Sequence, residues 1–251
     1  GQPVQAMNFG TMREAKDFQK MYEDVDSFEI HGNGNFIQQF ITSKFPKEIK
    51  WKRRDINVVN FDIEVASDDG FPHASEALHP IVSIALKSSK SSVYHVWGLD
   101  DYDVEKTPHK HLTIQYRKCK SEVELLAKFL EHWRNDYPDV ITGWNIRFFD
   151  IPYIVNRLAR VGSDKAVKAL SPWGMVNERQ VSFKGRNMDA YELTGINMMD
   201  YYDLFQKWGF TYGPQESYTL NHISSVVLGE KKLSYEEYGN LHTLYKENHQ
   251  L

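Results

Sequence analysis

Two carboxylates with one residue between them, Asp62 and Glu64, lie in the apolar segment VVNFDIEV at 58–65. A β-strand places alternate side chains on one face, so these two would share a face with Cα atoms ~6.6–7 Å apart, and Ile63 would point to the core. Neighbouring like charges raise each other's pKa unless a cation lies between them, and hard divalent metals prefer oxygen ligands. The pair is therefore a candidate metal site. An exposed polar strand face is the alternative, because an isolated Asp-x-Glu often occurs by chance.

A third carboxylate, Asp150, ends the segment NIRFFD at 145–150, where a short strand expected at 140–142 passes to a helix expected at 150–161. An acidic residue is favoured at a helix N-terminus as a cap, which is a sufficient structural reason for Asp150 on its own. Its chemical interest comes from its combination with the pair on the strand.

The elements that must position these carboxylates start with three expected strands, 56–65, 81–86 and 93–97, each rich in β-branched or aromatic residues. Consecutive strands of this kind indicate an antiparallel meander. A helix follows that opens with the capping-box pattern of Ser121 and Glu124 and ends before Pro138.

With the strand at 140–142 and the helix at 150–161, the order βββαβα predicts an α/β fold of the ribonuclease H-like kind. Further along we expect a hairpin that turns at 184–187, a strand that ends near Asp200 and a helix from about Ser217 that stops at Gly229. The sheet is thus expected to be mixed and five-stranded, with flanking helices. Ahead of it, a helical pattern at 12–24 and a mixed stretch at 28–41 indicate a small α+β piece.

Composition restricts the classes of protein. The 251 residues are 41% hydrophobic and 25% charged, which is typical of a globular protein with a core. The single cysteine, Cys119, excludes an internal disulfide within these residues and indicates a reducing setting. No apolar run approaches a membrane span, and the net charge of -4 excludes general polyanion binding, so any contact with nucleic acid must be local.

The two carboxylate segments together resemble the first and second exonuclease motifs of family B DNA polymerases, an Asp-x-Glu strand and an Asn-x-x-x-Phe-Asp turn. Further segments are similar to the T-even phage group in particular: DGFP at 69–72, TGWN at 142–145, FDIPY at 149–153, LSP at 170–172 and SYTL at 217–220. The resemblance implies a domain division: residues 1–54 would be the C-terminal part of the polymerase N-terminal domain, and residues 55–251 its 3′→5′ exonuclease domain.

Carried over residue by residue, the resemblance makes Asp62, Glu64 and Asp150 the metal ligands and catalytic residues. The family's fourth ligand belongs to a third motif, Tyr-x-x-x-Asp, which has no counterpart after Asp150 in these 251 residues. We therefore expect this chain alone to be a weak or inactive nuclease, cut off before that motif. Asp200 and Asp203 are acidic residues that could replace the missing ligand, although the family uses that segment structurally.

Three residues match positions that contact DNA in the family. Phe71 matches an aromatic residue that stacks on an unpaired base, and Asn145 and Phe149 match residues that touch the 3′-terminal nucleotide. Packing or turn formation is the alternative role for each of them. The hairpin near Gly185 corresponds to one that helps to separate primer from template.

The resemblance implies proofreading by two-metal hydrolysis, with Mg²⁺ or Mn²⁺ ions ~3.5–4 Å apart and 5′-mononucleotides as products. The expected partners are the 3′ end of single-stranded DNA and the remainder of the polymerase, with no membrane, in a monomer in the cytoplasm of a phage-infected bacterium. One alternative is a non-catalytic single-strand-binding portion of the polymerase. A glycosidase with Asp62 and Glu64 as acid and base is another, but neighbouring strand positions place the two side by side and not across a sugar.

Overall fold

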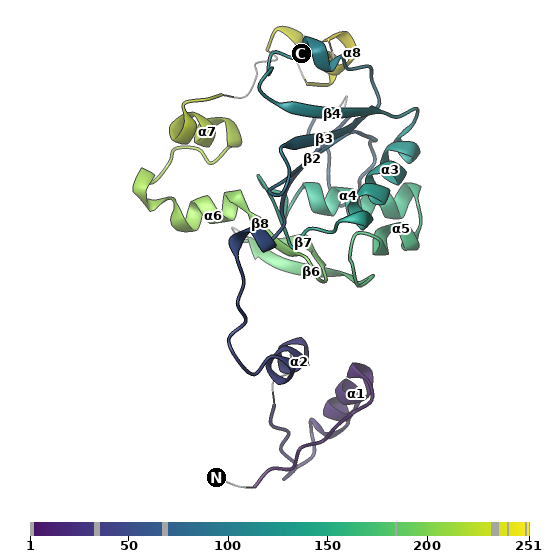
Figure 1. Cartoon of the computed structure of the whole chain (residues 1–251), viewed down its shortest axis with the longest axis vertical. Coiled ribbons are helices and arrows are strands. Elements are labelled where there is room, and N and C mark those ends of the chain that lie inside the picture. The colour runs from purple at the N-terminus through teal and green to yellow at the C-terminus, as the bar shows by residue number, and fades with distance from the viewer. Residues whose placement is uncertain are drawn as a thin grey trace. The chain divides into compact units, whose positions relative to one another are not determined.

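The computed structural model describes residues 3–32, 36–66, 70–183, 185–231, 236–239, 241–248 and 250. They belong to two compact units, residues 1–52 and 53–251 (Figure 1). The described part of the smaller unit contains the helices α1 (Met12–Tyr22) and α2 (Phe36–Lys44) and no strand, so the β component expected there is not found. Its apolar residues at 36, 37, 40 and 41 follow a helical period, which the turn residues before them obscure.

The larger unit contains the ribonuclease H-like domain. Its helices and strands, with the short 3-10 helices marked η, follow in this order: η1 (Arg53–Asp55), β1 (Val58–Val65), β2 (Ile81–Ser88), β3 (Val93–Gly98), η2 (Val104–Lys106), β4 (Thr113–Lys118), α3 (Glu122–Asn135), β5 (Val140–Gly143), α4 (Asp150–Val161), α5 (Asp164–Lys168), β6 (Val176–Phe183), β7 (Arg186–Leu193), β8 (Asn197–Asp200), α6 (Tyr201–Trp208), η3 (Gly209–Tyr212), α7 (Leu220–Leu228), η4 (Glu236–Tyr238) and α8 (Leu241–Asn248).

The central sheet has the strand order β4-β3-β2-β1-β5-β8. β1, β2 and β3 form the predicted antiparallel meander, whereas β4, β5 and β8 each run parallel to their neighbour, so the sheet is mixed as expected. The sheet has six strands, one more than predicted, because the sequence pattern did not indicate β4. That strand lies at the sheet edge with half of its residues exposed, and its sequence TIQYRK has little of the apolar signal that marks an inner strand.

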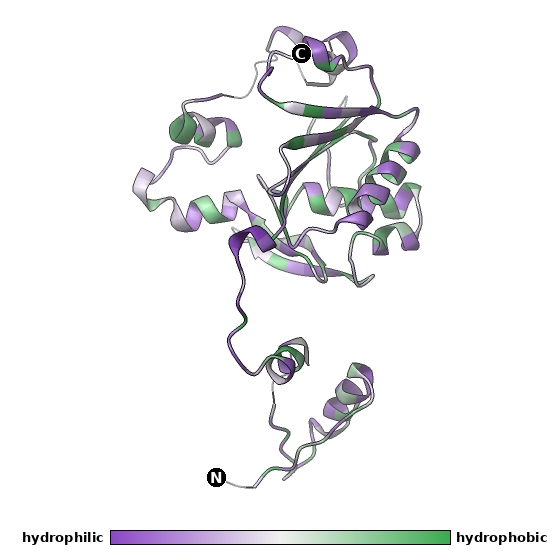
Figure 2. Ribbon diagram, viewed as in Figure 1, coloured by the Kyte–Doolittle hydropathy of each residue, from purple (hydrophilic) through white to green (hydrophobic). Residues whose placement is uncertain are grey.

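The core lies between the sheet and the helices that cover it. Val59, Phe61 and Ile63 of β1 are buried, and the Phe61 ring lies 6.0 Å from Phe129 and 6.1 Å from Trp133 of α3. Figure 1 shows α3, α4 and α5 on one side of the sheet and α6 and α7 on the other. In Figure 2 α3 and α4 carry both hydrophobic and hydrophilic residues, as helices do that pack one face on a sheet. The predicted alternation along β1 is confirmed.

The local predictions agree with the structure except at helix ends. Ser121 caps α3 by accepting a hydrogen bond from the Glu124 N–H, but the Glu124 carboxylate accepts from Lys120 and not from Ser121, so only half of the expected capping box forms. α7 begins three residues later than expected, behind Thr219, and ends as predicted at Gly229 in the left-handed conformation.

The predicted hairpin exists as the separate antiparallel pair β6–β7, with Gly185 at φ +76° in its turn. Gly185 supplies the positive φ that such a turn requires. In the described part of the chain, every helix is too short or too polar to cross a membrane.

Candidate active site

The candidate site lies where β1 continues past the end of β5. The two strands pair in parallel up to Asn60 and Thr142, and β5 ends at Gly143, so Asp62 lies beyond the last pair. Gly143 allows the end of β5 to lie close to β1 here, because a Cβ atom on it would lie 2.6 Å from the Phe61 carbonyl oxygen. Crevices at the carboxyl ends of parallel strands are common ligand sites in α/β folds.

Asp150 bonds to β1 beyond the last residue of β1 that pairs with β5. It is the first residue of α4, its side chain is buried, and its Oδ1 accepts a hydrogen bond of 3.1 Å from the Ile63 N–H of β1. Glu64 is half-buried and Asp62 is exposed on the β1 face opposite Ile63. Asp150 therefore links the start of the helix to the strand that carries the carboxylate pair, and the alternative role as a simple helix cap does not account for this bond.

The three carboxylates influence one another electrostatically. Burial raises the pKa of Asp150 well above its usual value, and the negative charge of Asp62, and to a smaller extent that of Glu64, raises it further. Backbone hydrogen bonds from Ile63 and from Asp150 itself oppose this rise in pKa. A buried carboxylate beside two like charges gains most from a cation, which lowers the free energy of its ionised form.

The side chains fit a hard divalent cation in type, because all three offer carboxylate oxygens. Among the residues that the structure describes, however, no three His, Cys, Asp or Glu side chains are already gathered as a metal-binding group. The structure thus brings Asp62, Glu64 and Asp150 into electrostatic reach of one another but does not test their assignment as ligands, which stays a prediction.

The loop between β5 and α4 is held by Asp200. This buried residue accepts three backbone hydrogen bonds of 2.9 Å, from the N–H groups of Asn145, Arg147 and Tyr202. Asn145 has φ +63°, a left-handed conformation that non-glycine residues seldom adopt, and its carbonyl accepts from the N–H of residues 148 and 149. The resemblance implied a structural role for the segment of Asp200, but no local pattern indicates these partners, because the contacts with Asn145 and Arg147 join segments more than fifty residues apart.

Asp200 and Asp203 are both engaged in contacts that shape this loop. Burial raises the pKa of Asp200, while its three backbone bonds act in the opposite direction. Asp203 forms an ion pair of 3.1 Å with Arg147. We therefore assign both carboxylates to loop structure in preference to the role of a replacement metal ligand.

Phe71 and Phe149 form an aromatic pair beside the carboxylates. Phe71 is 75% exposed, and its ring lies 4.8 Å from that of the half-buried Phe149, which in turn lies 5.6 Å from the buried Tyr153. An exposed ring that is supported by a second aromatic ring offers a surface on which a nucleobase can stack. The neighbouring Phe148 packs against Phe183 at the end of the hairpin, with ring centroids 4.8 Å apart.

A mixed sheet with a carboxylate pair on the inner strand β1, and a third carboxylate at the start of the helix after the neighbouring strand β5, defines a ribonuclease H-like exonuclease fold. The family model described as the exonuclease domain of DNA polymerase family B matches residues 22–223, and the chain belongs to this family. The interpretation of Asp62 and Glu64 as a glycosidase pair is thereby wrong.

Relatives of this chain include phage and cellular polymerases. It is 33% identical to the DNA-directed DNA polymerase of Escherichia phage RB69 and 28% identical to that of Enterobacteria phage T4, in both cases over the whole chain and 29% of the polymerase. It is 30% identical to the DNA polymerase delta catalytic subunit of Bos taurus, over 74% of the chain and 17% of that protein. The predicted likeness to the phage group is confirmed, and the chain spans 29% of the length of those phage relatives.

Proposed function

We propose that residues 55–251 form a divalent-metal-dependent 3′→5′ exonuclease domain that proofreads for a phage-like DNA polymerase. The observation that carries the proposal is the buried Asp150 carboxylate, bonded to the strand of Asp62 and Glu64 and raised in pKa by both. On this proposal residues 1–54 belong to the polymerase N-terminal domain. The protein acts as a monomer, together with the rest of the polymerase, in the cytoplasm of an infected bacterium.

The residues of the site divide in this proposal into metal ligands, DNA contacts and a residue that positions the loop. Asp62, Glu64 and Asp150 hold Mg²⁺ or Mn²⁺, which when bound activates water and stabilises charge on the phosphoryl oxygens of the 3′-terminal phosphodiester. Phe71 stacks on an unpaired base of the entering strand, and Asn145 and Phe149 contact the 3′-terminal nucleotide. Asp200 keeps residues 145–147 in place through their backbone N–H groups.

The metal assignment predicts that Mn²⁺ binds beside Asp62 and Glu64. Crystals soaked in Mn²⁺ should show an anomalous peak within coordinating distance of one of them, and Asp62→Asn should lower Mn²⁺ affinity in calorimetry by about 10-fold or more, because a carboxylate ligand is lost. Asp164→Asn is the control, since this exposed carboxylate lies in an i,i+4 pair with Lys168 on α5. Equal Mn²⁺ affinity for both variants and the parent protein would contradict the assignment.

The stacking assignment predicts that Phe71→Ala weakens the binding of a single-stranded oligonucleotide about 5–150-fold, the equivalent of ~1–3 kcal/mol for one base. Its thermal stability should change little, because the ring is 75% exposed. Phe210→Ala removes a ring with 77% exposure on η3 and should leave the affinity unchanged. A Phe71→Ala protein with normal affinity but a lower melting temperature would assign the ring to packing.

The alternative is that this portion of the polymerase binds single-stranded DNA without cutting it. The observation that favours it is the exposed Phe71 ring next to three candidate ligands where the family uses four. Release of 5′-mononucleotides that depends on Mn²⁺ separates the two functions, because a binding portion gives affinity without product.

A further inference from the structure

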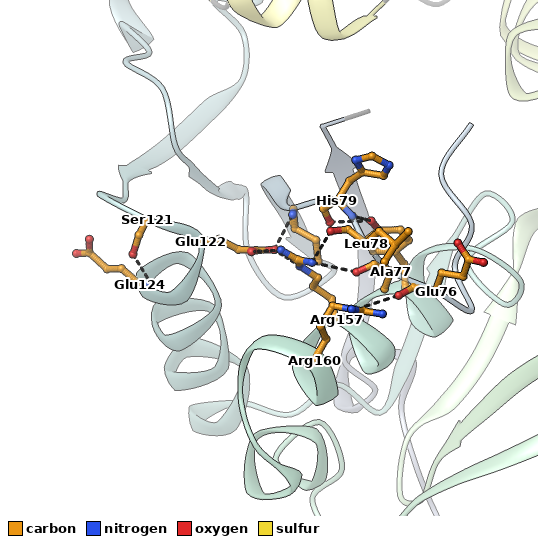
Figure 3. Close-up of polar contacts among 11 residues, drawn as sticks. Glu76, Ala77, Leu78, His79, Ser121, Glu122, Glu124, Arg157 and Arg160 are labelled. Carbon is orange, nitrogen blue, oxygen red and sulfur yellow. Dashed lines mark hydrogen bonds and ion pairs between the residues drawn. The ribbon is translucent and has the colours of Figure 1, made fainter. Parts of the chain in front are cut away.

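One face of α4 forms hydrogen bonds to the backbone of β1 and of residues 74–79, the segment that leads to β2. Asp150, Tyr153, Arg157 and Arg160 follow one another at steps of three, four and three residues, which places their side chains along one side of a helix. Each of the four forms a hydrogen bond to the backbone of residues 63–79. Figure 3 shows the part of this row that contains the two arginines.

Two members of the row make the closest contacts. The Tyr153 hydroxyl donates to the His79 carbonyl at 2.7 Å and accepts from the His79 N–H at 3.1 Å. Arg157 Nη1 donates to the carbonyls of Ala77 and Leu78 at 3.0 and 2.8 Å (Figure 3). Tyr153 and Arg157 are both buried; the bond from Arg157 to Ala77 is buried too, whereas the bonds to Leu78 and His79 are partly buried.

Two further bonds extend the contact along the segment. Asn156 Nδ2 donates to the Ala74 carbonyl at 2.9 Å, and Arg160 Nε donates to the Glu76 carbonyl at 3.2 Å. Residues 74–79 belong to neither a helix nor a strand, so their carbonyls have no strand or helix partner, and that of the buried Ala77 needs a donor from elsewhere. The side chains of α4 provide those donors, so the segment takes its conformation from the helix.

Glu122 of α3 fixes the Arg157 guanidinium. It accepts from Arg157 Nε at 2.8 Å and from Nη2 at 2.7 Å, a bidentate pair that leaves Nη1 for the carbonyls. The same carboxylate accepts from the Ile81 N–H at 2.7 Å at the start of β2. A planar guanidinium held in this way has one orientation, which a lysine could not reproduce.

The clamped segment contains a strained residue. Ala77 is fully buried and has φ +43°, in the left-handed region that favours glycine. Such a conformation persists only where the surroundings determine it, and the Ala77 carbonyl is one of the two that Arg157 binds. The helix thus sets the path of the chain just after Phe71.

We propose that Tyr153 and Arg157, with Glu122, are positioning residues that clamp residues 74–79 on α4 and thereby set the place of the Phe71 ring on Phe149 for the entering DNA strand. Phe149 precedes α4, and its ring contacts both Phe71 and Tyr153. Because Asp150 begins the same helix, the clamp also fixes the distance between the stacking surface and the carboxylates. This inference rests on the proposed function of Phe71 as a DNA contact.

The test compares two tyrosine hydroxyls in the full chain. Tyr153→Phe keeps the ring and removes the bonds to His79, whereas Tyr137→Phe removes a similar bond of 2.9 Å to the Ala169 carbonyl, in a loop that the clamp does not involve. Hydrogen exchange is read at the amides of Glu76 and Ala77. Both amides bond to the His73 carbonyl and neither touches Tyr153 directly. Affinity for a single-stranded oligothymidylate is measured in Ca²⁺ by fluorescence anisotropy.

In Tyr153→Phe we expect exchange at Glu76 and Ala77 about 5–10-fold faster and oligonucleotide affinity about 3–10-fold weaker, with neither effect in Tyr137→Phe. Because the clamp acts through Phe71, the double variant Tyr153→Phe/Phe71→Ala should bind no more weakly than Phe71→Ala alone. Unchanged exchange overturns the clamp, and losses that multiply in the double variant overturn its action through Phe71. Normal binding by Phe71→Ala contradicts the DNA-contact role itself, whereas the exchange result still decides whether α4 holds the segment.

Discussion

Single-stranded DNA should be digested about 10²–10⁴-fold faster by a chain that supplies a fourth metal-binding carboxylate than by residues 1–251 alone. Asp62, Glu64 and Asp150 are three candidate ligands, and no Tyr-x-x-x-Asp follows Asp150 within these residues. Metal affinity depends on the number and charge of the ligands, so the more loosely held ion of a pair is weakened most. Two bound ions stabilise the entering and the leaving oxygen of the phosphodiester. A site that holds only one of them loses several kcal/mol of transition-state stabilisation.

The measurement is the rate of 5′-mononucleotide release from a 3′-labelled strand in Mg²⁺, for residues 1–251 and for a longer chain that contains Tyr-x-x-x-Asp. In the longer chain Asp62→Ala should abolish release, and Asp164→Asn, on the exposed face of α5, should not. Equal rates for the two chain lengths would show that the present carboxylates suffice. A coding sequence that continues without the motif would also contradict the prediction.

The sequence predicts the site best where a local period sets the geometry. Alternation along β1 placed Ile63 in the core and Asp62 on the opposite face, and the helix expected at 150–161, with Pro152 in its first turn, is α4 with the observed bounds Asp150–Val161. Both predictions depend on neighbours within a few residues, for which strand and helix geometry is decisive.

Contacts between distant segments could not be predicted in this way. Asp200 bonds to the backbone N–H groups of Asn145 and Arg147, and Arg157 bonds to main-chain carbonyls, which are groups that nearly every residue possesses. A carbonyl acceptor leaves no trace in the sequence of the segment that offers it. The donor row on α4 does leave one, because polar residues at helical spacing on an otherwise buried helix need partners, and this pattern can be sought in other sequences.

The Glu122→Gln substitution is expected to destabilise the domain by about 3–5 kcal/mol, because it leaves the buried Arg157 guanidinium without a counter-charge. The side chains of Arg157 and Glu122 are only 9% and 11% exposed, so water cannot replace the lost carboxylate. The measurement is urea unfolding followed by fluorescence, in which the midpoint should fall while the slope stays constant.

Two comparisons separate this charge effect from a general sensitivity of α3. Glu124→Gln makes the same change two residues away, in the Glu124–Lys128 pair, whose side chains are 32% and 42% exposed; its loss should be much smaller, since solvent screens such pairs. The double variant Glu122→Gln/Arg157→Gln carries no unpaired charge and should lose less stability than the sum of the two single variants. If Glu122→Gln and Glu124→Gln unfold at the same urea concentration, the Glu122–Arg157 ion pair does not hold α4 to α3. The bonds from Arg157 to the Ala77 and Leu78 carbonyls would then not depend on Glu122.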